Sequence, residues 1–225
     1  NINSEKMSKS LGNFFTIKEV LERFDSEVLR FFLLSAHYRS PIDFSDKNLE
    51  EAAAALSRIY TSLAEIDGAL FAGKGGVPVE AVEELREKVE NFGARFTEAM
   101  DDDFNTAAAL AGVFELVRAA NRVMAECSPE EEPRRLLLQA RERIDEAGRV
   151  LGLFATPPAQ FLARMQERKL AESGVSPEEI GRLVQERAEA RKAKDFRRSD
   201  EIRDMLLARG IELLDRKEGT TWRLR

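Results

Sequence analysis

A short segment rich in lysine and serine near the start of the chain has the residue types that bind a polyphosphate. It reads KMSKS and spans residues 6–10. Lysine ammonium groups on one loop can stabilise the negative charge that develops on a leaving pyrophosphate, and serine hydroxyls add hydrogen bonds to phosphate oxygens. Two lysines three residues apart often belong to a solvated basic loop, but the complete string is much more specific. We therefore interpret Lys6, Ser8, Lys9 and Ser10 as candidate phosphate-binding residues.

Residues 181–225 are basic, although the chain as a whole carries a net charge of −6. They contain 13 Lys+Arg and 9 Asp+Glu, a net charge of +4, whereas residues 1–180 contain 22 and 32, a net charge of −10. A basic end on an acidic body indicates a contact with a polyanion that is confined to that end.

Two interpretations fit this basic segment. Its arginines and lysines recur at helical spacing with acidic residues between them, which a salt-bridged, solvated helix face also produces. Recognition of unstacked RNA bases needs, in addition, an aromatic platform, a guanidinium group and carboxylates that accept hydrogen bonds from base amino groups. Phe196, Arg191, Asp200 and Asp215 are the candidates for these roles. Trp222 stands at a strand position, where we expect it to pack in a core.

Local signals predict two short helices before a longer one. Thr16 and Glu19 form a capping-box pattern ahead of the segment IKEVLERF. Asp25 or Ser26 caps a segment that is apolar on nearly every side, so we expect this helix to be buried. Ser45 caps the long helix that follows.

Apolar residues at helical spacing predict a bundle of antiparallel helices in the middle of the chain. The segment DDDFNT interrupts the bundle, and we expect Asn105 or Thr106 to cap the next helix there. A metal site at Asp101–Asp103 is disfavoured, because consecutive carboxylates on a helix do not share a face and EF-hand spacing is absent. The bundle helices are expected at about residues 45–70, 80–100, 105–126 and 129–151.

The segment TPP at 156–158 is a candidate boundary, after which Ser176 and Pro177 start a further helix. A second helix is predicted over the segment RSDEIRDMLLAR, which starts at Arg198, and it ends at Gly210. Two β-prone runs around a glycine-containing turn then predict a small hairpin. The predicted fold class is mainly α: an antiparallel helical bundle, preceded by the KMSKS loop and a helical region, and followed by a small α+β domain of helices and a hairpin. The expected domains are residues 1–44, 45–172 and 173–225.

Composition excludes several classes of protein. No apolar run approaches the ~18 residues of a membrane span, and we expect a cytoplasmic protein without a membrane partner. Cys127 and His37 are the only cysteine and histidine, so a disulfide framework or a zinc site formed by this chain alone is not expected. We interpret His37 as a hydrogen-bonded structural residue where a helix ends.

Four separated stretches of the chain resemble one known family. KMSKS resembles the ATP-phosphate loop of class I aminoacyl-tRNA synthetases. The other stretches resemble cysteinyl-tRNA synthetases, in the same order along the chain. They read FDSEVLRFFLLSAHYRSPIDFS, MDDDFNTAAAL and EARKAKDFRRSDEIRDMLLARGIELLDRKEGTTWRLR. The chain thus resembles the C-terminal portion of this family, beginning at the KMSKS loop, with a bundle of the class I anticodon-binding type.

The resemblance implies an activity for the whole protein. Members of the family activate cysteine with ATP, with Mg²⁺ implied, and transfer it to tRNA-Cys; we expect a monomer. Lys6 and Lys9 would then act in catalysis, and Lys6, Ser8, Lys9 and Ser10 would bind the ATP phosphates. In this family the nucleotide-binding fold and the zinc ion that selects cysteine lie upstream of the KMSKS loop. The resemblance therefore places zinc in the full-length enzyme and not in this chain.

The resemblance also implies roles in the basic segment. The positions matching Arg191, Asp200 and Asp215 contact anticodon bases in the family, and Phe196 stands where an aromatic ring stacks on a base. Other members often carry tryptophan there; phenylalanine keeps the aromatic face but lacks the indole N–H. The turn DRKEGTTW also departs from the more usual Asp-Gly-Pro-Gln-Gly-Thr-Thr-Trp, which affects the expected loop geometry around Asp215.

Two alternatives belong to other classes of function. The chain could be a stand-alone tRNA-binding module without catalytic activity, in which KMSKS is a relic. It could also belong to a cysteine ligase paralogue that uses a small amine acceptor instead of tRNA. The intact RNA-like C-terminal segment argues against the paralogue. An upstream H-I-G-H segment with zinc ligands would eliminate the stand-alone module.

We predict that the 225-residue chain by itself is inactive in amino-acid activation. One loop of a two-sided ATP site cannot activate an amino acid, and the chain has no Gly-rich strand-to-helix turn. Cysteine-dependent exchange of pyrophosphate into ATP is the measurement. Exchange above the background without cysteine would contradict the prediction.

Overall fold

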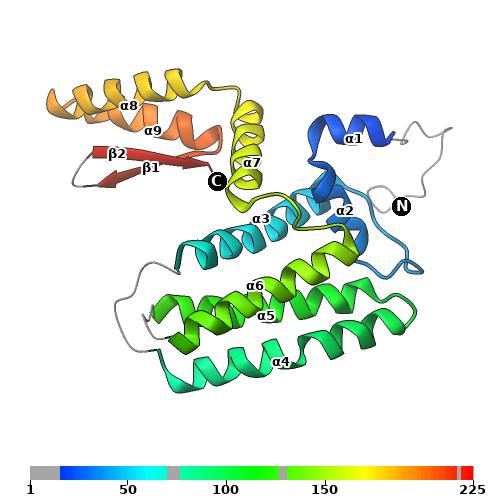
Figure 1. The fold of residues 1–225 in the computed structure, drawn as a ribbon. Coiled ribbons are helices and arrows are strands. Elements are labelled where there is room, and N and C mark those ends of the chain that lie inside the picture. Colours follow the sequence, from blue (N-terminus) through cyan, green and yellow to red (C-terminus); the bar gives the residue numbers. More distant parts are fainter. Residues whose placement is uncertain (1–15, 70–76, 127–130, 217–218, 225) are drawn as a thin grey trace. The chain divides into compact units, whose positions relative to one another are not determined.

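A computed structural model describes residues 16–69, 77–126, 131–216 and 219–224 (Figure 1). The predicted loop at residues 6–10, the turn AGKGGVP up to Gly76, Leu70, Cys127 and Pro129 lie outside these residues. The chain forms two compact units, Asn1–Leu162 and Ala163–Arg225. We call them unit 1 and unit 2. The three-domain division at residues 44 and 172 stays a prediction.

The described part of unit 1 begins with two short helices, α1 (Ile17–Arg23) and α2 (Ser26–Leu34). The capping box of Thr16 and Glu19 is confirmed at the start of α1, and Asp25 caps α2 by accepting a hydrogen bond from the backbone N–H of Glu27. The prediction of a buried α2 is only partly right. Val28 and Phe31 are buried, but the side chain of Leu33 is 48% exposed, because α2 packs mainly against α3 and leaves its opposite side uncovered among the described residues.

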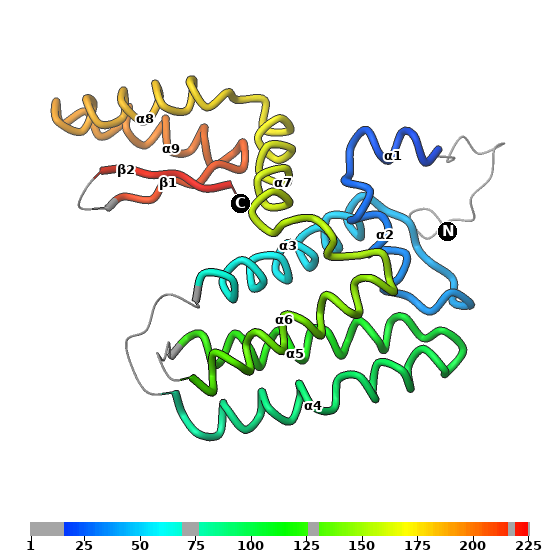
Figure 2. The backbone as a smooth tube through the Cα atoms, viewed as in Figure 1, coloured from blue at the N-terminus to red at the C-terminus, as the bar shows by residue number. Residues whose placement is uncertain are grey.

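The helical bundle is confirmed. Its helices are α3 (Asp46–Ala69), α4 (Val79–Asp101), α5 (Thr106–Glu126) and α6 (Glu131–Leu151). Both α5 and α6 contact α3 and α4, so they form the middle of the bundle, as the tube in Figure 2 also shows. Fully buried side chains come from all four helices, among them Leu49, Leu56, Ile59, Leu63, Ile66, Leu85, Leu116, Leu136 and Ile144.

Two tight corners join the helices of unit 1. Between α4 and α5, Asp103 and Phe104 adopt φ angles of 53° and 54°. Asn105 then accepts a hydrogen bond from the backbone N–H of Ala108 at 3.1 Å, which confirms it as the cap of α5. After α6, Gly152 and Phe154 have φ angles of 67° and 60° and turn the chain toward α7.

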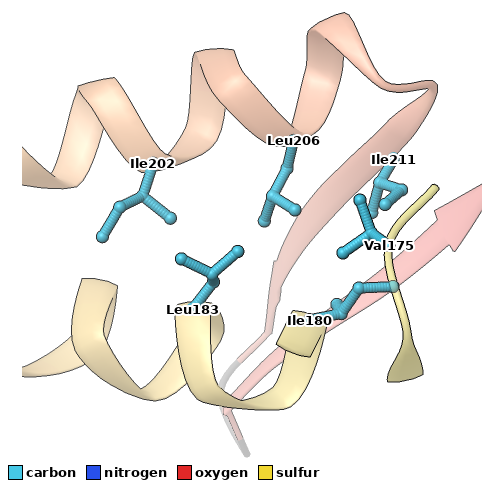
Figure 3. Close-up of a cluster of buried hydrophobic side chains, with 6 residues drawn as sticks. All are labelled: Val175, Ile180, Leu183, Ile202, Leu206 and Ile211. Carbon is cyan, nitrogen blue, oxygen red and sulfur yellow. The ribbon is translucent and has the colours of Figure 1, made fainter. Parts of the chain in front are cut away.

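Unit 2 consists of helices packed on a two-stranded antiparallel sheet. The helix α7 (Pro158–Ser173) runs across the division between the units, and α8 (Pro177–Lys192), α9 (Phe196–Ala208), β1 (Ile211–Arg216) and β2 (Gly219–Leu224) follow. Its core is drawn in Figure 3 and contains Val175, Ile180, Leu183, Ile202, Leu206 and Ile211. Trp222 packs against this core, as predicted.

The caps of unit 2 follow from its sequence, with one difference. Ser176 caps α8 with Pro177 in its first turn, as expected. The helix α9 begins at Phe196, earlier than the predicted segment that starts at Arg198, because Asp195 accepts a hydrogen bond from the backbone N–H of Arg198 and caps the helix. No helix of the described residues is long and apolar enough to cross a membrane.

Candidate nucleic-acid interface

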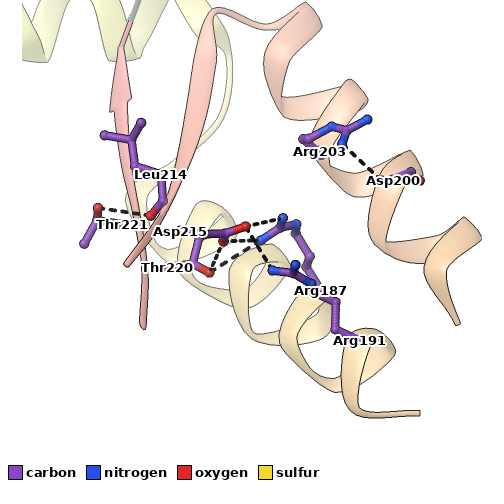
Figure 4. A network of polar contacts seen from close by, with 8 residues as sticks. All are labelled: Arg187, Arg191, Asp200, Arg203, Leu214, Asp215, Thr220 and Thr221. Atoms are coloured by element: carbon purple, nitrogen blue, oxygen red, sulfur yellow. Dashed lines mark hydrogen bonds and ion pairs between the residues drawn. The ribbon is translucent and has the colours of Figure 1, made fainter. Parts of the chain in front are cut away.

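The structure brings two of the predicted base-contacting residues together. Arg191, in the last turn of α8, donates from Nη1 to Oδ2 of Asp215 on β1 at 2.9 Å (Figure 4). The side chains of Arg191 and Asp215 are 50% and 44% exposed. A guanidinium and a carboxylate are therefore held side by side at the surface of unit 2.

Asp215 accepts hydrogen bonds from several protein donors. Arg187 donates from Nη1 to Oδ1 at 2.8 Å and from Nη2 to Oδ2 at 3.0 Å, and the Thr220 hydroxyl donates to Oδ1 at 2.8 Å. The hydrogen bonds from Arg187 and Thr220, followed by the charges of Arg187 and Arg191, hold the pKa of the Asp215 carboxyl far below its usual range. Asp215 is therefore a charged carboxylate that binds the side chains of two arginines.

Arg187 is, with Thr220, a member of this network that the base-contact candidates did not include. Its side chain is buried, with a relative exposure of 6%, and it lies one helical turn before Arg191 on the same face of α8. The spacing of four residues was visible in the sequence. The burial of Arg187 was not visible in the sequence, because it depends on where the hairpin packs.

Phe196 and Asp200 lie on α9, one turn apart. Phe196 is the first residue of the helix and is 63% exposed, which leaves its ring available for stacking. Asp200 pairs with Arg203 of its own helix, with Nη1 and Oδ1 3.2 Å apart. The negative charge of Asp200 also contributes to raising the pKa of Arg187, after the larger effect of Asp215.

Part of the basic segment forms ordinary surface ion pairs. Arg198 binds Glu186 of α8, with Nη2 and Oε1 2.7 Å apart, and also Glu201. Arg197 is 92% exposed and pairs with Glu201. Such exposed pairs contribute little to stability, so for these arginines the solvated, salt-bridged interpretation of the pattern is adequate.

We predict that Asp215→Asn destabilises unit 2 at neutral pH by about 1–2 kcal/mol, a range for charged hydrogen bonds reduced for partial exposure. The pKa of Asp215 is lowered in the folded state. Its contribution is therefore complete above the ordinary pKa of about 4 and is lost as the pH falls below that value toward the folded-state pKa.

Denaturant unfolding of wild type and Asp215→Asn, followed by the fluorescence of Trp222, measures this contribution. The difference between the two proteins should be the same at pH 7 and pH 5 and should shrink at more acidic pH. Asp204→Asn, which removes an exposed carboxylate of α9 paired with Arg203, is the control and should have a much smaller effect. A difference that grows on acidification would contradict the assignment.

The remaining candidate residues belong to unit 1. Lys6, Ser8, Lys9 and Ser10 are outside the described residues. His37 accepts a hydrogen bond from the backbone N–H of Arg39 at its Nδ1, 3.3 Å away, and stacks on Tyr38, which agrees with a structural histidine after α2. Asp103 accepts hydrogen bonds from Tyr38 and Arg39. In the described part of the chain, no three His, Cys, Asp or Glu residues are grouped so that they could hold a metal ion.

Comparison with protein families gives three matches in order along the chain. Residues 1–54 match the catalytic domain of class I (C) tRNA synthetases, and residues 95–155 match the DALR domain. Residues 173–223, which include Arg187, Arg191, Phe196, Asp200 and Asp215, match the anticodon-binding domain of cysteinyl-tRNA ligases.

Curated relatives are similar over essentially the whole chain. It is 60% identical over 225 residues to a cysteine–tRNA ligase of Geobacter metallireducens and 62% identical over 226 residues to one of Geobacter sulfurreducens. A cysteine–tRNA ligase of Syntrophotalea carbinolica is 49% identical over 228 residues. In each case all of the chain but only 46% of the relative is covered, so the chain spans a little under half the length of these proteins. The three family matches and this identity show that the chain belongs to the cysteinyl-tRNA synthetase family.

Proposed function

We propose that the chain is the tRNA-binding portion of a cysteine–tRNA ligase, which activates cysteine with ATP and transfers it to tRNA-Cys. Unit 2 reads the anticodon, and the bundle of α3–α6 is a helical spacer that lies along the chain between that unit and the catalytic part. The two functional ends of a tRNA lie far apart, so a helical connector has a physical purpose. A monomeric state stays a prediction of the family resemblance, and a cytoplasmic location stays a prediction from composition.

The observation that carries this proposal is the Arg191–Asp215 pair within the segment matched to an anticodon-binding domain. Single-stranded RNA is recognised by stacking on exposed aromatic rings and by hydrogen bonds to base edges. Phe196 offers an exposed ring, and the half-exposed guanidinium of Arg191 offers donors beyond the one directed at Asp215.

Zinc and ATP, which the family resemblance assigns to the whole enzyme, are not bound by the described residues alone. A structural zinc site is usually built from four cysteine and histidine ligands, and this chain has only one cysteine and one histidine, which do not make up such a set. No chemistry is therefore assigned to zinc here. The lysines and serines of the KMSKS segment suit ATP phosphates by residue type, and Lys6 and Lys9 would stabilise the pyrophosphate as it leaves.

We predict that the chain discriminates between tRNAs by their anticodon. A tRNA-Cys transcript with the GCA anticodon should bind at least about tenfold more tightly than the same transcript with all three anticodon bases changed, because good base-edge contacts contribute about 1–3 kcal/mol each. In Arg191→Ala the ratio of the two dissociation constants should fall close to one. Fluorescence anisotropy of labelled transcripts, at one fixed salt concentration, measures both dissociation constants.

Arg223→Ala is the matched control. Arg223 lies on β2, pairs with Glu212 and is 63% exposed. Arg223→Ala removes one positive charge, as Arg191→Ala does. It should weaken the binding of both transcripts equally and leave the ratio of their dissociation constants unchanged. If the wild-type chain binds both transcripts with equal affinity, the basic segment supplies only charge and anticodon recognition is wrong.

A further inference from the structure

We infer that Arg187 is a positioning residue of the anticodon-reading surface: it orients the Asp215 carboxylate and, through it, the guanidinium of Arg191. This inference rests on the proposed function. Arg187 itself is buried and does not reach an RNA base. Its effect on recognition is exerted entirely through the two exposed side chains that it organises.

The first support is the geometry of the Arg187–Asp215 pair. Two parallel hydrogen bonds, of 2.8 and 3.0 Å, join the planar guanidinium to both carboxylate oxygens. Such a bidentate contact determines the plane of the carboxylate as well as its distance, which a single point charge cannot do. Asp215 is thereby tied to α8, although it belongs to the hairpin (Figure 4).

Thr220 supplies a third point of attachment from the neighbouring strand. It is the cross-strand partner of Asp215, and its hydroxyl donates to Oδ1 at 2.8 Å. Nη1 of Arg187 also lies 3.4 Å from Oγ1 of Thr220. The carboxylate is therefore held from a helix and from a strand before any ligand arrives.

Arg187 lies on α8 between a buried residue and a half-exposed one. Leu183, Arg187 and Arg191 follow one another at intervals of four residues on one helix face. Leu183 lies in the core of unit 2 and Arg187 is equally buried, while half of the Arg191 side chain is exposed. Arg191 thus projects from a rigid base, and rigid preorganisation lowers the entropy lost when a ligand binds.

Stability alone does not explain a charged group at this place. The Nε atom of Arg187 is buried and has no hydrogen-bond partner among the described residues, an unfavourable arrangement for a donor. Well-packed apolar residues often replace buried ion pairs without loss of stability. What an apolar side chain cannot provide is the orientation of Asp215 and Arg191.

The test uses the full chain, Arg187→Met and Arg187→Lys, and the two transcripts described above. The ratio of the two dissociation constants should fall about tenfold in Arg187→Met, because one well-oriented base contact is lost. Arg187→Lys keeps the charge but cannot form two parallel bonds, so the ratio should remain well below that of the wild type. In an Arg191→Ala background, Arg187→Met should reduce the ratio no further.

Two controls separate positioning from charge and from loss of stability. Arg223→Met removes one exposed positive charge from the hairpin, and Ile202→Val shortens a buried side chain of α9. Both should leave the ratio unchanged. Trp222 fluorescence shows whether each variant keeps unit 2 folded. If Arg187→Met unfolds, Arg187→Lys and Thr220→Val, which removes only the hydroxyl, still test the inference.

Each outcome bears on one proposal. A wild-type ratio near one overturns the proposed function and leaves Arg187 nothing to position. A normal wild-type ratio that persists in folded Arg187→Met, or is restored fully by Arg187→Lys, overturns the positioning role. A loss that adds to that of Arg191→Ala would mean that Arg187 acts independently of Arg191, and it overturns the inference as well.

Discussion

Replacing Phe161 with alanine should lower the free energy of unfolding of unit 1 by about 3–5 kcal/mol, the usual range for removing a buried aromatic side chain. Phe161 lies in the first half of α7 and is fully buried. Its ring stacks on that of Tyr60, with 3.9 Å between the centroids and an angle of 12° between the planes. The cavity cannot easily collapse, because Tyr60 is itself held in place.

Tyr60 is held by a polar contact at the centre of otherwise apolar packing. Its hydroxyl donates to both carboxylate oxygens of Glu27 at 2.8 and 3.0 Å, and Glu27 also accepts from the backbone N–H of Phe154 at 2.6 Å. Burial, together with the hydrogen bond and the charge of Glu27, raises the pKa of Tyr60 well above its ordinary value. Moving Tyr60 into the space left by Phe161 would break this contact in a buried place.

Phe104→Ala is the matched control for Phe161→Ala. It is the same substitution in the same unit, but Phe104 is 66% exposed, so its effect should stay below about 1 kcal/mol. Denaturant unfolding followed by far-ultraviolet circular dichroism measures both variants. Equal effects of the two substitutions would contradict the packing of Phe161 described here.

Local signals in the sequence predicted the bundle helices and four helix caps, but not the earlier start of α9 at Phe196. Thr16, Asp25, Asn105 and Ser176 each accept a backbone N–H at a helix start where the sequence predicts a cap. These predictions succeed because a cap involves residues two or three positions apart. The bundle followed for a similar reason, since the period of apolar residues identifies the face that each helix buries.

The sequence predicted which residue types form the candidate site, but it did not predict the contacts between them. The sequence indicated Arg191 and Asp215 separately, but it could not show that they touch, because they are 24 positions apart and lie on a helix and a strand that meet only in the folded chain. Arg187 was missed for a related reason: a sequence shows its charge, while only the packing of β1 on α8 shows that it is buried. The contact from Glu27 to Phe154, 127 residues apart, was equally invisible.

Gly148→Ala should lower the free energy of unfolding of unit 1 by about 1–3 kcal/mol, even though alanine is the better helix former. Gly148 is buried in the last turns of α6. An added Cβ would lie 2.5 Å from the backbone oxygen of Leu153 and 3.0 Å from Cδ2 of Phe154. The clash with Leu153 involves backbone, which cannot rotate away as the end of a long side chain can.

The corner after α6 has little freedom to relax around a new methyl group. The backbone N–H of Leu153 donates to the carbonyl of Gly148 at 2.9 Å, and that of Phe154 donates to Glu27. Phe154 already adopts a φ of 60°, which is strained for a residue with a side chain. Shifting the corner to accept the added methyl group would therefore weaken at least one of these hydrogen bonds.

Gly93→Ala provides a control with the opposite expected sign. Gly93 lies in the interior of α4 and is exposed, and in the described part of the chain no atom lies within 4 Å of the position that a Cβ would take. Alanine should stabilise the helix there by about 0.5–1 kcal/mol. Chemical denaturation of both variants measures the two effects in one unit with one type of substitution. If Gly148→Ala is as stabilising as Gly93→Ala, the α6–α7 corner is not packed against Gly148 as described.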